Sequence, residues 1–383
     1  MMFRRLLPIP VVAFIFCWPS VSTAEEPFRF PDASYGKGKL QYINDLPVLT
    51  VEGTPEEIGE QIGILAVKPA PQILNIFHEF LKLRGLEKAW PWLVRVAHLM
   101  AAQIPADHVK EMEAAAKASG FDRDTVIVLH TVYDIAKLSG CSTLYAEPDR
   151  SATGKLLLGH NLDFYAIGNV HEFSLVIVCR PQGKHAFASV GFPGLFGCMS
   201  AINDAGLSLV TNEVTSTSDG SPKFDLKGVP FILAFRRIME ECATVDEAEK
   251  LLLSIHRTST INLTVCDKKE GRIFEITPKN VKVRPADKGL GMCTNHFRTK
   301  ELATNMHCWR YDVLLKSQDL KNVGRKDIAK KLDEANQKEA TIQTMIFEPA
   351  TLRLDLAIGK GPTSARPMKT LELATLLKKD SQE

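Results

Sequence analysis

Apolar residues recur at helical spacing through the first third of the chain, after a short strand-like run at 46–51. This period predicts a mostly helical N-terminal region, with helices at about 55–68, 70–84, 88–103, 106–118 and 123–137. The first helix has a clear start signal, because Thr54 can cap it, Pro55 suits its first turn and Glu57 can close a capping box. Residues 25–45 show no such period and are expected to be irregular.

Beyond residue 141 the pattern changes to short alternating or apolar runs separated by turn residues, which are typical of strands. Strands are predicted at about 155–161, 172–180, 185–190, 197–203, 206–213, 261–267, 272–277, 280–284 and 289–295. Helices are predicted at about 228–241, 244–256, 324–336 and 368–378, and a hairpin at 340–348 and 351–358. Strands, a helix pair and further strands predict an α+β fold, in which two sheets pack together with helices outside.

Residues 25–383 contain no internal repeat and no long linker, so they are expected to form one integrated domain. The segment 1–24 differs, because Arg4 and Arg5 precede an apolar run at 6–18 and Ser22-Thr23-Ala24 offers small residues at a cleavage site. This is the pattern of a secretory signal peptide and predicts a secreted or periplasmic protein. No later segment is apolar enough to span a bilayer, so no transmembrane anchor is expected after signal removal.

The formal net charge of +2 equals the two arginines of the signal, so the rest of the chain is formally neutral. A neutral chain has no electrostatic attraction for nucleic acid or an anionic membrane.

One of the eight cysteines lies in the signal, and the others are spread out without a C-x-x-C motif. Their odd number predicts at least one unpaired thiol in an exported protein. Most of the others fit buried apolar positions, and the spacing leaves open whether one or two disulfides form.

Cys141 is the candidate for the unpaired thiol, and its surroundings indicate a nucleophile that frees itself. It follows Gly140 and precedes a strand-like segment. Cutting the Gly140–Cys141 bond would release a mostly helical chain, 25–140, and leave Cys141 at the start of 141–383 with both a thiol and an α-amine. Such an amine, with an ordinary pKa of about 7.7–8.0, can act as a general base at neutral pH. A buried structural cysteine is the alternative.

Three further positions can complete such a site. Asp163 ends the next strand and can hold the new α-amine by a charge-assisted hydrogen bond. Asn212 lies in Thr211-Asn212-Glu213, a strand end whose backbone N–H can donate to an oxyanion, and the amide of Asn295 after a hydrophobic strand suits the same task. Taken alone, each of these residues equally fits an ordinary turn or strand end.

Five short motifs occur in a recognisable order between about residues 46 and 360. They are Gly53-Thr54-Pro55-Glu56-Glu57-Ile58-Gly59, Gly140-Cys141-Ser142-Thr143, Gly159-His160-Asn161-Leu162-Asp163-Phe164, Gly228-Val229-Pro230 and Thr294-Asn295-His296. With them the chain resembles the acyl-CoA:6-aminopenicillanic acid acyltransferase family, the C45-type N-terminal nucleophile proteins. It is similar, more distantly, to choloylglycine hydrolases, penicillin V acylase and acid ceramidase.

The resemblance implies a four-layer αββα sandwich of the N-terminal nucleophile hydrolase type and self-cleavage between Gly140 and Cys141. It implies that Cys141 is the nucleophile and that Asp163 orients its amine. The side chain of Asn295 and the backbone N–H of Glu213 would then be the two oxyanion donors.

Four candidate substrate-binding residues accompany this catalytic set: Thr143, Asn212, His160 and Lys338. Two of them depart from the family pattern. His160 stands where the ceramidase branch has an arginine. Lys338 stands near the position of a family arginine, and a lysine offers a point charge instead of a bidentate fork.

The predicted function is therefore that of an exported, self-processing cysteine amidohydrolase or acyltransferase. It would cleave the amide bond of a small N-acyl molecule through a Cys141 thioester, without a cofactor, and keep its own N-terminal fragment as a partner.

Phe192 and Phe196 are candidates for an apolar acyl pocket, with core packing as their alternative role. A non-catalytic exported binding protein with the same fold is the other functional hypothesis. A zinc hydrolase fits poorly, because the Cys and His residues at 293–308 lack the usual ligand spacing.

Overall fold

A computed structural model describes residues 27–378, apart from 84, 86, 138 and 165–168. The predicted signal peptide, 1–24, lies outside the described residues.

The described chain folds around two β-sheets, one of ten strands and one of six. The larger sheet has the order β1 (Ala33–Tyr35), β2 (Gly38–Ile43), β3 (Leu46–Gly53), β6 (Leu175–Pro181), β7 (Phe187–Gly191), β8 (Ser200–Asn203), β9 (Ser208–Glu213), β10 (Ile261–Cys266), β11 (Gly271–Ile276) and β12 (Val281–Pro285). The smaller has the order β13 (Leu290–Cys293), β4 (Ser139–Ala146), β5 (Leu157–Phe164), β14 (Thr341–Glu348), β15 (Arg353–Ile358) and β16 (Lys369–Glu372).

The two sheets face each other across a buried layer of side chains. Val178 and Val210 of the larger sheet and Leu158 and Met345 of the smaller one belong to this layer. On each strand the next residue points to the opposite face, as Leu209 and Leu144 do, and packs against helices. The core therefore consists of three apolar layers, one between the sheets and one under each outer set of helices.

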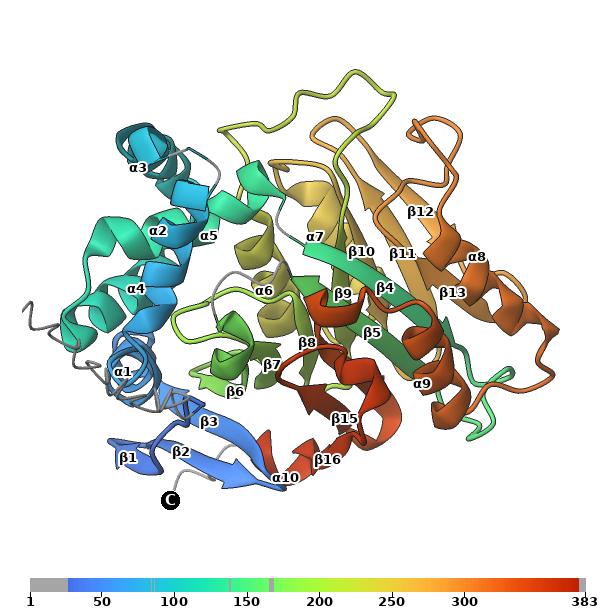
Figure 1. The fold of residues 1–383 in the computed structure, drawn as a ribbon, viewed down its shortest axis with the longest axis horizontal. Helices are drawn as coiled ribbons and strands as arrows, with labels where there is room; N and C mark the ends of the chain where they lie inside the picture. The colour runs from blue at the N-terminus through green and yellow to red at the C-terminus, as the bar shows by residue number, and fades with distance from the viewer. Residues whose placement is uncertain (1–26, 84, 86, 138, 165–168, 379–383) are drawn as a thin grey trace, which may run out of the picture.

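Helices cover both outer faces (Figure 1). The outer face of the ten-stranded sheet packs against α1 (Pro55–Ile62), α4 (Ala106–Ser119), α5 (Arg123–Ala136), α6 (Phe231–Glu241) and α7 (Val245–Ser254). The outer face of the six-stranded sheet packs against α8 (Trp309–Leu315) and α9 (Arg325–Glu334). The remaining helices are α2 (Gln72–Leu83), α3 (Trp90–Ala101), which packs on α5, and the short α10 (Leu373–Leu376). The predicted αββα sandwich is confirmed.

The chain before Cys141 is built into the same sheet as the chain after it. Strands β1 to β3 form one edge of the ten-stranded sheet, and β3 runs parallel to β6, with Val48 opposite Val176 and Gly53 opposite Pro181. Parallel neighbours cannot be joined by a short hairpin, so all five N-terminal helices lie between them along the chain. Residues on both sides of position 141 therefore share one core.

Local signals located most elements within a few residues. The capping box at the start of α1 is present, because Thr54 Oγ1 accepts from Glu57 N–H and Glu57 Oε2 accepts from Thr54 N–H. The helix predicted at 55–68 has the expected extent, but its last turn, Gly63–Val67, is a π-helix. There Gly63 lies against α4, and a Cβ at this position would come within 2.7 Å of Ala115 O.

Three predictions of local structure are wrong. Residues 33–35 and 38–43 are strands instead of irregular chain, since they pair as a hairpin and β2 then pairs with β3. Residues 309–315 form a helix, α8, where no helix or strand was predicted. The predicted C-terminal helix at 368–378 begins as an edge strand, β16, because Arg353 to Leu356 offer it an open sheet edge, and only the four residues of α10 are helical.

A buried network of charges joins α4 to α6. Arg236 donates from Nη2 to Glu111 Oε2 at 2.6 Å and from Nε to Glu240 Oε1 at 2.7 Å, and all three residues are about 2% exposed or less. His108 Nε2 and Lys184 Nζ also contact Glu240, at 3.1 and 2.9 Å. Burial opposes the charge of Glu240, but Arg236 and His108 hold the pKa of Glu240 below its usual range. The network connects a helix before Cys141 to one after it.

The seven cysteines of the described chain are all unpaired and buried. No helix among residues 27–378, outside the gaps named above, is both long and apolar enough to cross a membrane.

Candidate active site

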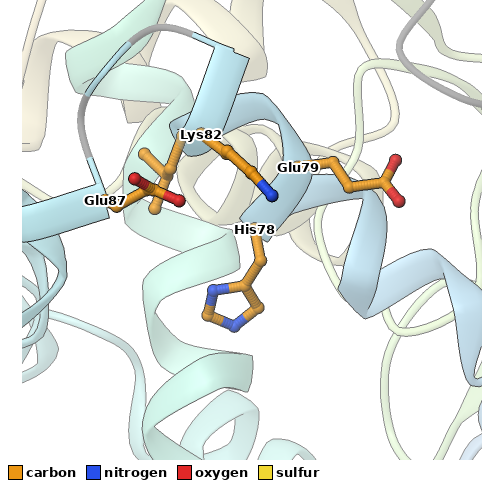
Figure 2. Close-up of a pocket in the computed structure, with 5 residues that line it drawn as sticks. His78, Glu79, Lys82 and Glu87 are labelled. Carbon is orange, nitrogen blue, oxygen red and sulfur yellow. The ribbon is translucent and has the colours of Figure 1, made fainter.

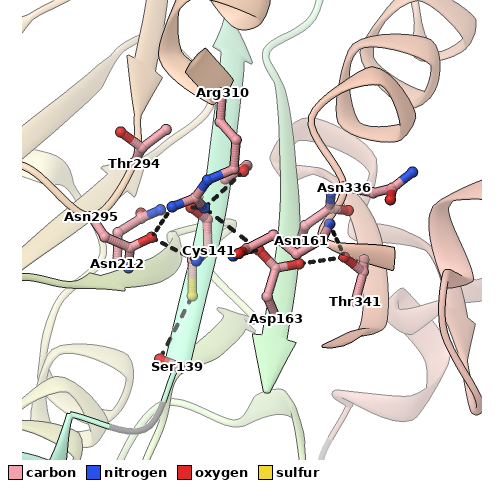
Figure 3. Close-up of polar contacts among 12 residues, drawn as sticks. Ser139, Cys141, Asn161, Asp163, Asn212, Thr294, Asn295, Arg310, Asn336 and Thr341 are labelled. Atoms are coloured by element: carbon pink, nitrogen blue, oxygen red, sulfur yellow. Dashed lines mark hydrogen bonds and ion pairs between the residues drawn. The ribbon is translucent and has the colours of Figure 1, made fainter. Parts of the chain in front are cut away.

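The candidate nucleophile lies near the start of β4, which is next to the edge strand β13 in the six-stranded sheet. β4 places Gly140 opposite Asp163 of β5, and Thr143 opposite both His160 of β5 and Cys293 of β13. The Gly140–Cys141 bond is part of the strand. Figure 3 shows the polar side chains that gather around it from β5, β9 and the segments after β13 and α9.

The Cys141 side chain is fully buried, with 0% of its surface exposed. Its Sγ lies 3.8 Å from Ser139 Oγ. Burial raises the pKa of the Cys141 thiol well above its ordinary value, and the nearby carboxylates of Asp163 and Glu213 raise it further. The thiol is therefore protonated in the uncut chain and needs a base before it can attack.

Asn295 contacts the scissile peptide directly. Its Oδ1 accepts a hydrogen bond from the backbone N–H of Cys141 at 2.9 Å, and its Nδ2 donates to Glu213 O at 2.8 Å. An amide nitrogen carries two hydrogens, so one donor remains after the bond to Glu213. The geometry places a carboxamide beside the bond that would be cut, as the sequence predicts.

Arg310, on the first turn of α8, is the cation of this site. Its Nη1 donates to Cys141 O at 2.6 Å, and its Nη2 donates to Asn295 Oδ1 at 2.9 Å (Figure 3). Nη1 also lies 3.5 Å from Asp163 Oδ2. A planar fork of donors is suited to holding several acceptors at once. Arg310 thus ties the nucleophile, the candidate oxyanion donor and the candidate amine-binding carboxylate together.

Asp163 is almost completely buried, with 2% of its surface exposed. Burial raises the pKa of its carboxyl, and hydrogen bonds from Thr341 Oγ1 and Gln337 Nε2 together with the charge of Arg310 act in the opposite direction. Its position directly across the ladder from Gly140 places it at the scissile bond.

Glu213 contributes more than the backbone N–H predicted from sequence. Its carboxylate Oε2 accepts from the backbone N–H of Ser139 at 2.8 Å, and its carbonyl accepts from Asn295. The residue is 3% exposed. Glu213 therefore anchors the strand two residues before the nucleophile and also holds Asn295.

Three of the four candidate substrate-binding residues lie together between the sheets. Thr143 Oγ1 is 3.0 Å from His160 Nδ1 and donates to Asn212 Oδ1 at 2.9 Å, and all three side chains are 0% exposed. They contact one another in the layer between β4, β5 and β9. This placement favours a role in holding the two sheets over direct contact with a substrate.

Lys338, the fourth candidate, is not brought into this group. It is exposed in the short turn Lys338–Ala340, and its backbone N–H donates to Asn336 Oδ1 at 2.8 Å. Its neighbour Gln337 contacts Asp163 instead. The cation that contacts Cys141, Asn295 and Asp163 is Arg310, from a different segment.

The sequence prediction missed Arg310, the Glu213 carboxylate and Gln337. Arg310 follows Asn295 by only 15 positions, and α8, which carries it, was not predicted because it is a short helix of seven residues. The signal that could have found it is an arginine between apolar and aromatic residues, Trp309 and Tyr311, shortly after the Asn295 motif.

Phe192 and Phe196, the candidates for an acyl pocket, are both 4% exposed. The Phe192 ring lies 6.1 Å from that of Phe164, which follows Asp163 directly on β5. Phe196 packs on His130 and offers its carbonyl to Arg236. Phe192 is therefore the better placed of the two for contact with a bound acyl group.

An open cavity of about 440 Å³ lies elsewhere, at α2 (Figure 2). It is lined by His78, Glu79, Leu81, Lys82 and Glu87. None of these residues belongs to the Cys141 group. Within the residues that the structure describes, no three His, Cys, Asp or Glu side chains meet as a metal site.

Cys308, at the start of α8, is the most acidic thiol of the site region. Burial opposes its ionisation, but hydrogen bonds with the His296 side chain and the Tyr311 backbone lower the pKa of Cys308 to about 6. A thiol with this pKa is about 90% thiolate at pH 7, and the thiolate is the reactive form.

We expect iodoacetamide to alkylate Cys308 before Cys141 in the uncut chain at pH 7. Peptide mass spectrometry of briefly labelled protein measures this, with the fully buried Cys266 as an internal reference. The labelling rate at Cys308 should reach half its maximum near pH 6. A rate that still rises between pH 8 and 9 would show that its pKa is not lowered.

Comparisons with known proteins found one matching family, one curated relative and several similar solved structures. A sequence model of the family described as acyl-coenzyme A:6-aminopenicillanic acid acyl-transferase matches residues 150–325. That range contains Asp163, Glu213, Asn295 and Arg310, and it begins after Cys141. An uncharacterised protein of Archaeoglobus fulgidus is 24% identical over 306 residues, which cover 70% of this chain and 48% of that protein. The chain thus spans about half the length of this curated relative.

Three solved structures are similar at low identity. They are an N-acylethanolamine-hydrolysing acid amidase orthologue from Caenorhabditis elegans (17% identity, TM-score 0.44, 55% of this chain and 93% of that one), a mutant conjugated bile acid hydrolase from Clostridium perfringens (12%, 0.46, 63% and 95%) and penicillin V acylase from Agrobacterium tumefaciens (11%, 0.38, 61% and 86%). The family match over 150–325 confirms the resemblance that the motifs indicate, so the chain is similar over this range to the acyl-coenzyme A:6-aminopenicillanic acid acyl-transferases.

Proposed function

We propose that this protein is an exported, self-processing cysteine amidohydrolase or acyltransferase that cleaves the amide bond of a small N-acyl substrate through a Cys141 thioester. One observation carries the proposal. The N–H and C=O of Cys141 are held by Asn295 and Arg310, next to the buried carboxylate of Asp163, and the residue before it is a glycine. Side chains from two distant segments therefore hold the backbone of this one cysteine.

Self-cleavage would be the first reaction. Cys141 Sγ attacks the carbonyl carbon of Gly140, the C–N bond breaks, and the nitrogen leaves as the α-amine of Cys141, so that Gly140 is held as a thioester. Water then releases a Gly140 carboxylate and regenerates the thiol. Asp163, whose pKa is raised by burial, lies opposite Gly140 and is suited to move the proton from sulfur to the leaving nitrogen.

Substrate turnover would reuse the same groups. The new α-amine takes the thiol proton, and the resulting ammonium is held by Asp163. The thiolate attacks the amide carbonyl of the substrate, and the oxyanion is stabilised by Asn295 Nδ2 and the backbone N–H of Glu213. Loss of one such donor typically costs about 3–4 kcal/mol of transition-state stabilisation. The thioester is then transferred to water or to an acceptor amine.

Hydrolysis is the favoured outcome of the second step. The predicted signal peptide implies export, and acyl-CoA is a cytosolic substrate, so an exported enzyme would act on N-acyl compounds and use water. The fragment 25–140 would stay bound after cleavage, since its strands β1 to β3 belong to the same sheet as β6.

The test is to determine the amino termini and intact masses of protein exported from a host cell. The proposal expects two fragments, one beginning at Glu25 and one beginning Cys141-Ser142-Thr143. A Cys141→Ala variant should give a single chain. An unmodified Gly140–Cys141 bond after long incubation of the folded wild-type protein would overturn the proposal.

A binding protein that keeps the fold without the chemistry is the second candidate. The complete burial of Cys141 favours it, because a nucleophile must be reached by a substrate. Wild-type and Cys141→Ala proteins separate the two functions. Equal binding of N-acyl amides, with no turnover by either protein, would support the binding protein.

Gly140→Ala should slow self-cleavage. A Cβ at this position would lie 2.2 Å from Gln337 Nε2, which donates to Asp163, so the strand or Gln337 must move. Gln337 Nε2 is the end of a flexible side chain, so the Cβ would displace it and remove its hydrogen bond to Asp163, the proposed proton carrier. Hydrogen bonds to charged groups contribute about 1.5–3 kcal/mol, so we expect cleavage to be slower by about tenfold. Gel densitometry of freshly folded precursor over time measures the rate.

Gly324→Ala is the matched control for that variant. Its Cβ would meet its nearest atoms at 3.5 Å, an ordinary contact, and its cleavage rate should equal that of the wild type. Equal rates for both glycine variants and the wild type would contradict the steric argument.

A further inference from the structure

A chain of hydrogen bonds crosses from one sheet to the other beside the site. It starts at His160 on β5, passes through Thr143 on β4 and ends at Asn212 on β9. The first two strands belong to the six-stranded sheet and the third to the ten-stranded sheet. Elsewhere the layer between these sheets contains side chains such as Val178, Val210 and Met345. A polar connection in such a layer carries a desolvation cost and calls for an explanation.

With the Asn212 side-chain oxygen facing Thr143, one set of donors satisfies both contacts. Thr143 has one hydroxyl hydrogen, which it donates to Asn212 Oδ1. The contact at 3.0 Å between Thr143 Oγ1 and His160 Nδ1 therefore needs the hydrogen of His160 Nδ1. Burial lowers the pKa of His160 to about 3, which agrees with a neutral ring that donates through Nδ1 alone. The connection is thus a single ordered series, from His160 through Thr143 to Asn212.

The hydrogen-bonded series lies next to the proposed reacting groups on both sheets. Thr143 follows Cys141 by two residues, so the two side chains lie on the same face of β4. Asn212 directly precedes Glu213, whose carbonyl holds Asn295 and whose N–H is a proposed oxyanion donor. The nucleophile and that N–H are therefore carried by different sheets, and the Thr143–Asn212 bond joins the two strands that carry them.

We propose that Thr143 and Asn212 are positioning residues, which set the distance between the two sheets at the active site, and that His160 fixes the orientation of the Thr143 hydroxyl. The inference rests on the proposed function. In that reaction one carbonyl group must reach Cys141 Sγ on one sheet and the Glu213 N–H on the other at the same time. A displacement of about 1 Å between such groups can lower a rate about 100-fold.

Two variants at position 143 separate positioning from packing. Thr143→Ser keeps the hydroxyl, and Thr143→Val keeps the shape but removes the hydroxyl. We expect Thr143→Val to lower kcat of the cleaved enzyme by about 10- to 100-fold, with KM changed less than about threefold. Thr143→Ser should restore kcat to within about threefold of the wild type. The probe is a fluorogenic N-acyl amide that the wild type hydrolyses, and the rate is divided by the titrated amount of N-terminal Cys141.

The double variant Thr143→Val/Asn212→Leu tests the same point from both sheets. Replacing both partners of a buried hydrogen bond by apolar groups can leave stability almost unchanged, and here only the Nδ1 hydrogen of His160 then loses its acceptor. A double variant with wild-type thermal stability and a lowered kcat would support positioning. If Thr143→Val does not accumulate as folded protein, Asn212→Leu alone removes the same bond and gives the same measurement.

The outcomes are distinct. Equal kcat in Thr143→Val, Thr143→Ser and the wild type would overturn the inference and leave the proposed function intact. A kcat that falls only in step with the fraction of folded protein would also overturn it. A wild type that is neither cut at Gly140 nor active on any N-acyl amide would overturn the proposed function itself, and the inference with it.

Discussion

Arg310→Lys is expected to lower the rates of self-cleavage and of amide hydrolysis by about 100-fold. Lysine keeps the positive charge, but a single ammonium cannot reproduce the planar fork that contacts Cys141 O and Asn295 Oδ1 at 2.6 and 2.9 Å. The groups it aligns would shift relative to one another, and a misplacement of about 1 Å can cost about 100-fold in rate. The cleavage rate of the refolded precursor measures the first effect and kcat of the cleaved protein the second.

Lys338→Met is the discriminating control for this experiment. Family pattern alone placed the cationic role near Lys338, whereas the structure places Lys338 on the surface and Arg310 in the site. We therefore expect Lys338→Met to cleave itself and to hydrolyse substrate at rates within about twofold of the wild type. A large loss with Lys338→Met and none with Arg310→Lys would reverse the assignment.

Arg236→Met should destabilise the fold by about 3–5 kcal/mol, the usual result of removing one partner from a buried ion pair. The change leaves Glu111 and Glu240, both buried, without the guanidinium that contacts them at 2.6 and 2.7 Å. Urea unfolding followed by circular dichroism measures the free energy of unfolding. Both this variant and its reference should carry Cys141→Ala, so that a single uncut chain is compared.

Arg237→Met is a matched control on the next residue of the same helix. Arg237 pairs with Glu241 at 2.8 Å on the surface, where the two side chains are 27% and 38% exposed. Exposed pairs of this kind contribute about 0–1 kcal/mol, so Arg237→Met should change the free energy of unfolding by no more than that. Similar losses in both variants would show that burial does not strengthen the Arg236 network.

Elements with a local start or stop signal were predictable from the sequence. The capping box of Thr54 and Glu57 located α1, and the apolar period located α4 and α5 to within a residue or two. Elements stabilised mainly by pairing with distant residues were not. β16 reads as a helix by composition, but Thr370 and Leu371 lie along the open edge of β15, and pairing there overrides a weak helical preference.

The residues of the candidate active site also differ in whether the local sequence indicated them. Cys141, Asp163 and Asn295 stand next to strand ends with motif neighbours, and the structure brings them together. Arg310 had no such signal, since the helix that carries it is short and two of its partners, Cys141 and Asp163, are far away along the chain. Thr143, His160 and Asn212 were predicted, with Lys338, to bind substrate, but the burial of these three between two sheets depends on how the sheets stack, which no single strand reveals.

The parallel pairing of β3 with β6 has a consequence for the life of the mature protein. If the bond before Cys141 is cut, strands of two separate polypeptides become neighbours in one sheet. Folding of the precursor is a one-molecule process, whereas reassembly after denaturation would need two molecules to meet, and its yield would depend on concentration. The cut protein would then persist because it unfolds slowly, and heat inactivation would be irreversible in dilute solution.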